Sequence, residues 1–156
     1  PLVLDADGIN ALAGHMDEWE RRRGRVTVLT PHEGEFLRVG GNLSQGRTAA
    51  AEDFARRSEA VVVLKGPGTV VAGPDGRCRV NTTGNCGMAK GGSGDVLSGV
   101  VLALLGLGMD AFDACCCAVW LHGRAGDLAA QEKGQWGMTP TDLLERLPQA
   151  LREVTE

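Results

Sequence analysis

Short apolar runs separated by helical patterns dominate the first half of this chain. Three such runs are each followed by polar or glycine residues: 2–4, 26–29 and 60–64. Buried parallel strands have this form, because both of their faces are covered and polar residues gather where they end. Two further runs, 70–72 and 77–80, flank Gly-Pro-Asp-Gly at 73–76, which predicts a β-hairpin.

Apolar residues at helical spacing lie between these strands and after the hairpin. Helices are expected over residues 9–22, 33–39, 48–58, 95–107 and 111–131. The fourth of these is apolar on nearly every side, which predicts a buried helix. A last helix starts at Thr139, with Pro140 in its first turn, and is expected to break at Pro148, leaving 151–153 as an exposed tail. Alternating strands and helices predict an α/β domain with a mainly parallel sheet.

Polar residues follow each of the three predicted parallel strands. They are Asp5 to Asp7, Thr30 to Glu33, and Lys65 to Gly66. A glycine-rich loop, 84–95, reaches the same edge if the helix after it packs on the sheet. Open α/β sheets bind ligands beyond the carboxyl ends of their strands, so the pattern predicts a site at this edge.

The glycine-rich loop and Asp95 indicate phosphate chemistry. Glycines allow close approach of the backbone to a ligand, and the free N–H groups of a following helix attract anions. A carboxylate at this point could deprotonate a hydroxyl during phosphoryl transfer. The alternative is that Asp95 is an ordinary N-cap. The loop matches neither the P-loop nor the dinucleotide-binding turn, and Ser93 lacks the setting of a hydrolase nucleophile.

Composition narrows the class of protein. The 156 residues suit a single domain, 1–156, and 43% hydrophobic with 23% charged residues is typical of a soluble globular protein. A net charge of −4 argues against a nucleic-acid partner. No apolar window is long enough to cross a membrane, so no membrane partner is expected. Five cysteines, three of them consecutive at 115–117, predict reduced, buried thiols and a cytoplasmic location.

Six motifs occur in order along the chain. The longest is Asn-Thr-Thr-Gly-Asn-Cys-Gly-Met-Ala-Lys-Gly-Gly-Ser-Gly-Asp-Val-Leu-Ser-Gly at 81–99. The other five are Asp-Ala-Asp-Gly-Ile-Asn-Ala-Leu at 5–12, Thr-Pro-His-Glu-Gly-Glu-Phe at 30–36, Leu-Lys-Gly-Pro-Gly-Thr at 64–69, Leu-His-Gly-Arg-Ala-Gly at 121–126 and Thr-Asp-Leu-Leu at 141–144. Together they resemble the ADP/ATP-dependent NAD(P)H-hydrate dehydratases, a branch of the ribokinase-like superfamily. Cys86 stands where proline is usual in that family.

The resemblance implies a ribokinase-like fold and repair of a damaged nicotinamide nucleotide. ADP or ATP, with Mg²⁺, would phosphorylate the ring hydroxyl of NAD(P)H hydrate, and loss of phosphate would restore the double bond. Members of this family open with further strands and helices, whereas this chain begins at what would be a middle strand. We therefore expect a domain lacking its N-terminal strands, with an apolar sheet edge that favours a homo-oligomer.

The resemblance also implies roles for residues at the strand ends. Asp95 would be the catalytic base and contact the substrate, and His32 would bind the substrate. The nucleotide would be bound by Lys65, Gly66, Pro67, Gly68, Thr69 and Gly94. The metal ligands stay unassigned. Asn85 is expected to hold the loop in shape, and His122 to be a packed or capping residue.

Two alternative functions stay open. A ribokinase-like small-molecule kinase would share the nucleotide loop and Asp95 but release a stable phosphoester. A non-catalytic nucleotide-binding fragment would result if the N-terminal half of the pocket were missing. The motif at 81–99 favours the dehydratase over the kinase.

Overall fold

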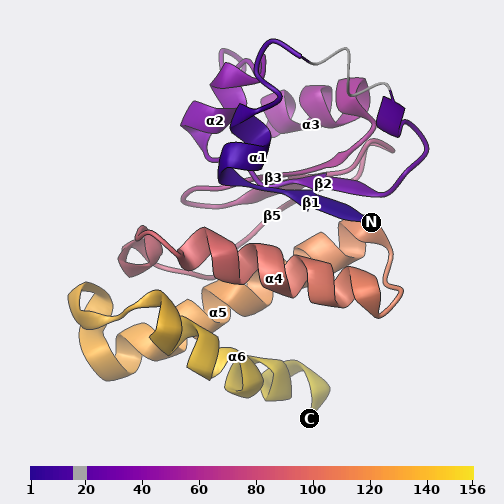
Figure 1. The fold of residues 1–156 in the computed structure, drawn as a ribbon. Coiled ribbons are helices and arrows are strands. Elements are labelled where there is room, and N and C mark those ends of the chain that lie inside the picture. Colours follow the sequence, from indigo (N-terminus) through magenta and orange to yellow (C-terminus); the bar gives the residue numbers. More distant parts are fainter. Residues whose placement is uncertain (16–20) are drawn as a thin grey trace.

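A five-stranded sheet lies between two layers of helices in the computed structural model, which describes residues 1–15 and 21–156 (Figure 1). The strands follow one another in chain order: β1 (Leu2–Leu4), β2 (Thr27–Leu29), β3 (Val61–Leu64), β4 (Val70–Ala72) and β5 (Cys78–Val80). β1, β2 and β3 are parallel, while β4 pairs antiparallel with both β3 and β5. The predicted mainly parallel sheet with a terminal hairpin is confirmed.

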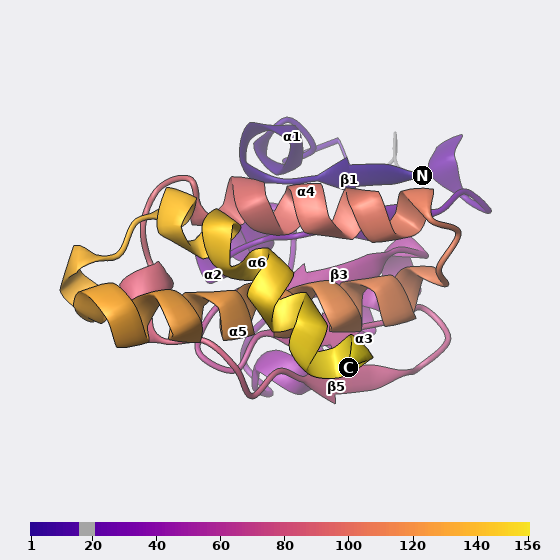
Figure 2. The same ribbon diagram turned by 90° about the horizontal axis from the view of Figure 1, so that it is seen from below.

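Helices cover both faces of the sheet. One face carries α1 (Ala6–Asn10), α2 (Glu33–Arg38) and α3 (Arg47–Ser58). Below the other face lie α4 (Ser93–Gly106) and α5 (Ala111–Gly137), preceded by the 3₁₀ turn η2 (Cys86–Met88). α6 (Pro140–Thr155) crosses α5 on the side away from the sheet (Figure 2). None of the helices in 1–15 and 21–156 is both long and apolar enough to span a membrane.

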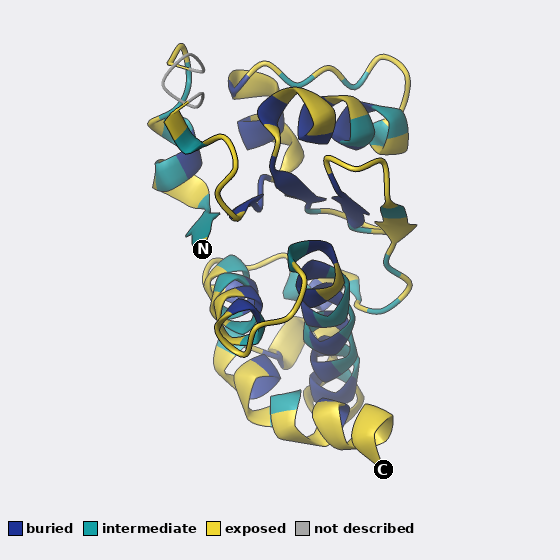
Figure 3. Cartoon of the chain, turned by 90° about the vertical axis from the view of Figure 1, so that its right-hand side faces the viewer, coloured by how far each residue is buried: buried dark blue, intermediate teal, exposed yellow. Residues whose placement is uncertain are grey.

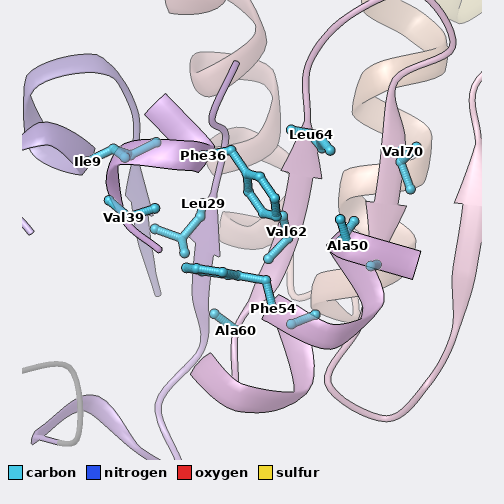
Figure 4. Close-up of a cluster of buried hydrophobic side chains, with 13 residues drawn as sticks. Ile9, Leu29, Phe36, Val39, Ala50, Phe54, Ala60, Val62, Leu64 and Val70 are labelled. Carbon is cyan, nitrogen blue, oxygen red and sulfur yellow. The ribbon is translucent and has the colours of Figure 1, made fainter. Parts of the chain in front are cut away.

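Each face of the sheet has its own hydrophobic core, because successive strand residues point to opposite sides. Val62 and Leu64 of β3 pack with Phe36 and Phe54 beneath α2 and α3, where the two ring centroids are 5.2 Å apart (Figure 4). Val61 and Val63 face the other way and join the core formed with α4 and α5. Figure 3 shows the buried residues of helices and strands turned toward one another.

The predicted helix over residues 9–22 is wrong in its described part. α1 ends at Asn10, residues 11–14 form a turn, and Gly14 has a φ of +79°. Ile9 is the one residue of α1 that is buried, so this segment has no continuous apolar face to hold a longer helix in place. Met16 and Trp19, which supported the longer helix, lie outside the described residues.

Pro148 does not end the last helix. α6 continues through it to Thr155. The proline is exposed, whereas Leu143 and Ala150 are buried against α5 on the opposite side. The carbonyl that loses its N–H partner therefore faces water, and packing on the other side holds the helix together.

The helix predicted to be buried all round is buried on one side. α4 begins at Ser93, and its apolar buried face consists of Leu97, Val101 and Leu105. Leu102 is 50% exposed, on a helix that runs beside β1 at the edge of the sheet (Figure 2). β1 pairs only with β2 among the described strands, which leaves its three residues half-buried rather than buried.

Candidate functional site

An ion pair joins the ends of β1 and β3, and the start of α4 lies against this pair. The Lys65 ammonium lies 2.5 Å from Asp5 Oδ1 and 3.8 Å from Glu35 Oε2. Burial would raise the pKa of Asp5, but the hydrogen bond and charge of Lys65 lower it below its usual value. Gly94 fits against this pair: a Cβ there would lie 3.0 Å from Asp5 Oδ2 and 3.4 Å from Lys65 Nζ. Glycine at this position therefore lets α4 approach the strand ends closely.

His32 lies next to Lys65 and begins α2. A parallel bridge joins the backbones of His32 and Lys65. His32 Nδ1 accepts a hydrogen bond from the Glu35 amide at 3.2 Å, and the His32 amide donates to Glu35 Oε2 at 2.8 Å. This capping box fixes the backbone while 53% of the His32 side chain stays exposed. The imidazole is thus positioned at the strand ends and accessible to a ligand.

The loop Lys65–Thr69 is shaped by Arg47, a residue that the sequence did not single out. The Arg47 guanidinium donates to the carbonyl oxygens of Leu64, Pro67 and Gly68. A Cβ at Gly66, whose φ is +150°, would lie 2.7 Å from Arg47 Nη2. Because these carbonyls are directed at Arg47, they are turned away from any anion bound by the loop.

The glycine-rich loop is held by side-chain amides and by α5. Asn85 accepts a hydrogen bond from the Gly87 amide, and its own amide donates to Asp127 Oδ1 at 2.9 Å. Asp127 Oδ2 also accepts the Gly84 amide at 2.9 Å. Asn85 therefore holds the loop in shape, as expected. Asp127, which the sequence did not single out, fixes the loop to α5.

Lys90 ties the same loop to the far end of α5. Its ammonium donates to the carbonyl oxygens of Gln135, Trp136 and Met138, just after the kink at Gly134. A cation at the carboxyl end of a helix is favourable, because carbonyl oxygens there lack helical partners. Lys90 therefore has a structural role in the described structure.

Asp95 lies in the first turn of α4 and is exposed. The N-cap is Gly92, with a φ of +94°, so the alternative that Asp95 is the N-cap is wrong. Directly before it, Gly94 contacts the Asp5–Lys65 pair. The helix start thus presents an accessible carboxylate beside the ends of the parallel strands.

His122 of α5 supports the start of α4 from the other side. Its Nε2 lies 2.9 Å from the Ser93 carbonyl oxygen. Burial lowers the pKa of His122 to about 4; the hydrogen bond to Ser93 opposes this shift, and the nearby charge of Lys65 adds to it. The ring is therefore neutral at pH 7 and can donate to Ser93. A packed, capping role for His122 agrees with this geometry.

The predicted site residues lie close together in the structure to different extents. It places Lys65 against Gly94, His32 beside Lys65, and Asp95 next in sequence to Gly94. Gly66, Pro67, Gly68 and Thr69 form the turn between β3 and β4, held by Arg47 and by a bond from the Thr69 hydroxyl to the Gly66 carbonyl. In the described chain, no three His, Cys, Asp or Glu side chains lie close enough to hold a metal ion.

A protein-family model described as NAD(P)H-hydrate dehydratase matches residues 1–149. The whole chain is 47% identical to a bifunctional NAD(P)H-hydrate repair enzyme of Thermofilum pendens, of which it spans 30%. Over 95% of its length it is 40% identical to the ADP-dependent (S)-NAD(P)H-hydrate dehydratase of Bacillus subtilis, of which it spans 53%.

Solved structures agree with this likeness. A Bacillus subtilis ADP/ATP-dependent NAD(P)H-hydrate dehydratase, co-crystallised with ATP and Mg²⁺, superposes with a TM-score of 0.79 at 38% identity. The match covers 84% of this chain and 49% of that one. A ribokinase-like protein of Enterococcus faecalis gives the same TM-score at 26% identity, covering 97% of this chain and 52% of the other. The chain thus has a ribokinase-like fold and spans about half the length of these structures.

Proposed function

The chain belongs to the NAD(P)H-hydrate dehydratase family, and from this premise we propose that it takes part in ADP- or ATP-dependent dehydration of NAD(P)H hydrate. One observation carries the proposal: Gly94, directly before Asp95, lies against Asp5 and Lys65 at the ends of the parallel strands. The helix start in the 81–99 motif thus faces the residues that the family would use for substrate and nucleotide.

In the proposed reaction Asp95 is the base. Its carboxylate takes the proton of the ring hydroxyl while that oxygen attacks the terminal phosphorus of the nucleotide, and the phosphoanhydride bond breaks. The ring C–O bond then breaks and phosphate leaves with its electron pair, while the adjacent ring carbon loses a proton to water and the electrons of that C–H bond form the double bond. The exposure of Asp95 supports this role, because an accessible carboxylate can reach a bound hydroxyl.

The nucleotide is proposed to lie along Lys65, Gly66, Pro67, Gly68, Thr69 and Gly94. Backbone N–H groups in the first turn of α4 would contact its phosphates, as helix N-termini do. His32 would contact the hydrated nicotinamide, since its ring is exposed beside Lys65. Mg²⁺, when bound, would neutralise phosphate charge, and it would be held largely by the phosphates themselves, as is usual for this ion.

The test is to incubate the chain with hydrated NADH, Mg²⁺ and ADP or ATP while following NADH absorbance. Asp95→Asn should retain nucleotide binding and lose about 10²–10⁴-fold in turnover, the usual contribution of a positioned base. Turnover within a fewfold of the parent would remove Asp95 from the chemistry.

The same assay separates the two alternative functions. A small-molecule kinase would consume nucleotide with an alcohol acceptor and accumulate a stable phosphoester. A non-catalytic nucleotide-binding fragment would be stabilised by ADP or ATP without turnover, because binding to the folded state alone raises the melting temperature. No thermal shift at millimolar nucleotide would contradict the proposed nucleotide site.

We also propose that this chain self-associates and acts in the cytoplasm. Among the described strands β1 has one partner, and an unpaired strand edge can pair with another chain. All five cysteines are free thiols, which suits a reducing compartment. The expected burial holds for Cys115 alone: Cys78, Cys116 and Cys117 are half-buried, and Cys86 is exposed on the surface of the glycine-rich loop.

A further inference from the structure

We propose that Asp5 is a positioning residue that couples the loop Lys65–Thr69 to the first turn of α4. This inference rests on the proposed function, in which that loop and that turn together bind the nucleotide. In the structure its contacts reach residues 60 and 93 positions away.

Both carboxylate oxygens of Asp5 accept hydrogen bonds. Oδ1 accepts hydrogen bonds from the Ala6 amide at 2.9 Å and from the Lys65 ammonium at 2.5 Å. Oδ2 accepts a hydrogen bond from the Ser98 hydroxyl at 3.2 Å and lies next to Gly94. One side chain therefore links the end of β1, the end of β3 and the first two turns of α4.

The Asp5–Lys65 ion pair is largely shielded from solvent. The side chains of Asp5 and Lys65 are 14% and 21% exposed. Charges taken partly out of water are costly to leave unpaired, so loss of Asp5 should make Lys65 seek another carboxylate. Glu35, now 3.8 Å away, is the nearest candidate, and it belongs to α2 rather than α4.

A shift of Lys65 toward Glu35 would move its ammonium away from Gly94. The bond from Ser98 would at the same time lose its charged acceptor, which weakens it. Small displacements of groups that bind a reacting ligand are expensive, so the loop and the helix turn would no longer hold their shared ligand in one geometry. Asp5 thus acts on the nucleotide through Lys65 and Ser98, without touching it.

The test combines two measurements on Asp5→Asn, which keeps the shape of the side chain and removes its charge. The first is amide hydrogen exchange of residues 66–69 and 94–98 without ligand. The second is the Kd for ADP in the presence of Mg²⁺, measured by calorimetry. Asp7→Asn is the matched control, since Asp7 is exposed and, among the described residues, its side chain accepts one long hydrogen bond of 3.4 Å, from Asn10. Ser98→Ala removes the link to α4 alone.

We expect Asp5→Asn to speed exchange in both segments and to raise the Kd for ADP about tenfold. Ser98→Ala should speed exchange in 94–98 but not in 66–69, and Asp7→Asn should change neither. Because Asp5 acts partly through Lys65, Asp5→Asn should weaken ADP binding less in a Lys65→Met background than in the parent.

Unchanged exchange in 94–98 on Asp5→Asn would overturn the inference. So would faster exchange with a parental Kd, which would make Asp5 merely structural, or fully additive effects of Asp5→Asn and Lys65→Met. If the parent chain fails to bind ADP, the proposed nucleotide site is wrong, and the exchange rates alone decide the coupling. If Asp5→Asn does not fold, Ser98→Ala decides it by the same exchange criterion.

Discussion

Gly123→Ala tests whether α5 depends on its close contact with the start of the 81–99 motif. Gly123 is buried within α5, and a Cβ there would lie 2.7 Å from the carbonyl carbon of Thr83 and 2.8 Å from its oxygen. These are backbone atoms, so the overlap cannot be relieved by rotating a side chain. The segment around Thr83 would have to move away from α5.

The expected size of the effect follows from three terms. Alanine in a helix interior gains about 1 kcal/mol over glycine. Overpacking typically costs about 1–3 kcal/mol. Displacement of Thr83 also lengthens the 2.9 Å bond from its hydroxyl to the Trp120 carbonyl, a loss of about 1 kcal/mol. We therefore expect a net destabilisation of roughly 1–3 kcal/mol, or about 2–4 °C in Tm for each kcal/mol in a domain of this size.

Gly99→Ala is the matched control. Gly99 is also helical, but a Cβ there meets no atom within 4 Å. Only the helix-propensity term applies, so this variant should gain about 1 kcal/mol. Thermal and urea unfolding of both variants should shift in opposite directions. A Gly123→Ala variant as stable as Gly99→Ala would refute the described packing of α5 on Thr83.

Three further predictions concern stability and assembly. The folded pKa of His122, about 4, lies below the ordinary histidine value of 6.5, so the unfolded state binds the proton more tightly. Stability should be full above pH 6.5 and fall by up to about 3 kcal/mol toward pH 4, and His122→Asn should flatten this dependence in urea unfolding. Lys90→Met should cost about 1–2 kcal/mol by removing the cation from the end of α5, and an unchanged Tm would contradict that role. Sedimentation velocity should show association that increases with concentration, whereas a monomer at every concentration would rule out the proposed β1 edge contact.

The strands and the β-hairpin were predictable because their signals are local. Runs such as Val61–Leu64 are apolar at every position, and the Gly-Pro-Asp-Gly turn marks the hairpin directly. Helix extents depended on tertiary packing instead. Pro148 is tolerated because it faces water, and Leu102 is exposed because the described chain has nothing packed over that side of α4.

The candidate site was predictable in its motifs but not in its connections. His32, Lys65 and Asp95 follow strand ends or begin a helix, which sequence periodicity can locate. Arg47 and Ser98 gave no such signal, because their importance arises from contacts with distant residues that only the folded chain brings close. A half-buried arginine at the start of α3, facing a glycine loop, is recognisable only once the loop is folded.

The order of the sheet has a consequence for how the chain folds. Each strand from β2 to β5 pairs with the strand just before it, so each can dock as soon as it is synthesised. The valines on the lower face, such as Val63 and Val71, are covered by α4 and α5, which come later in the chain. We therefore expect an intermediate with a paired sheet and one bare apolar face, the stage most prone to aggregation. Pulse-labelled hydrogen exchange during refolding should show protected amides in β3 and β4 before α5. Simultaneous protection would exclude this intermediate.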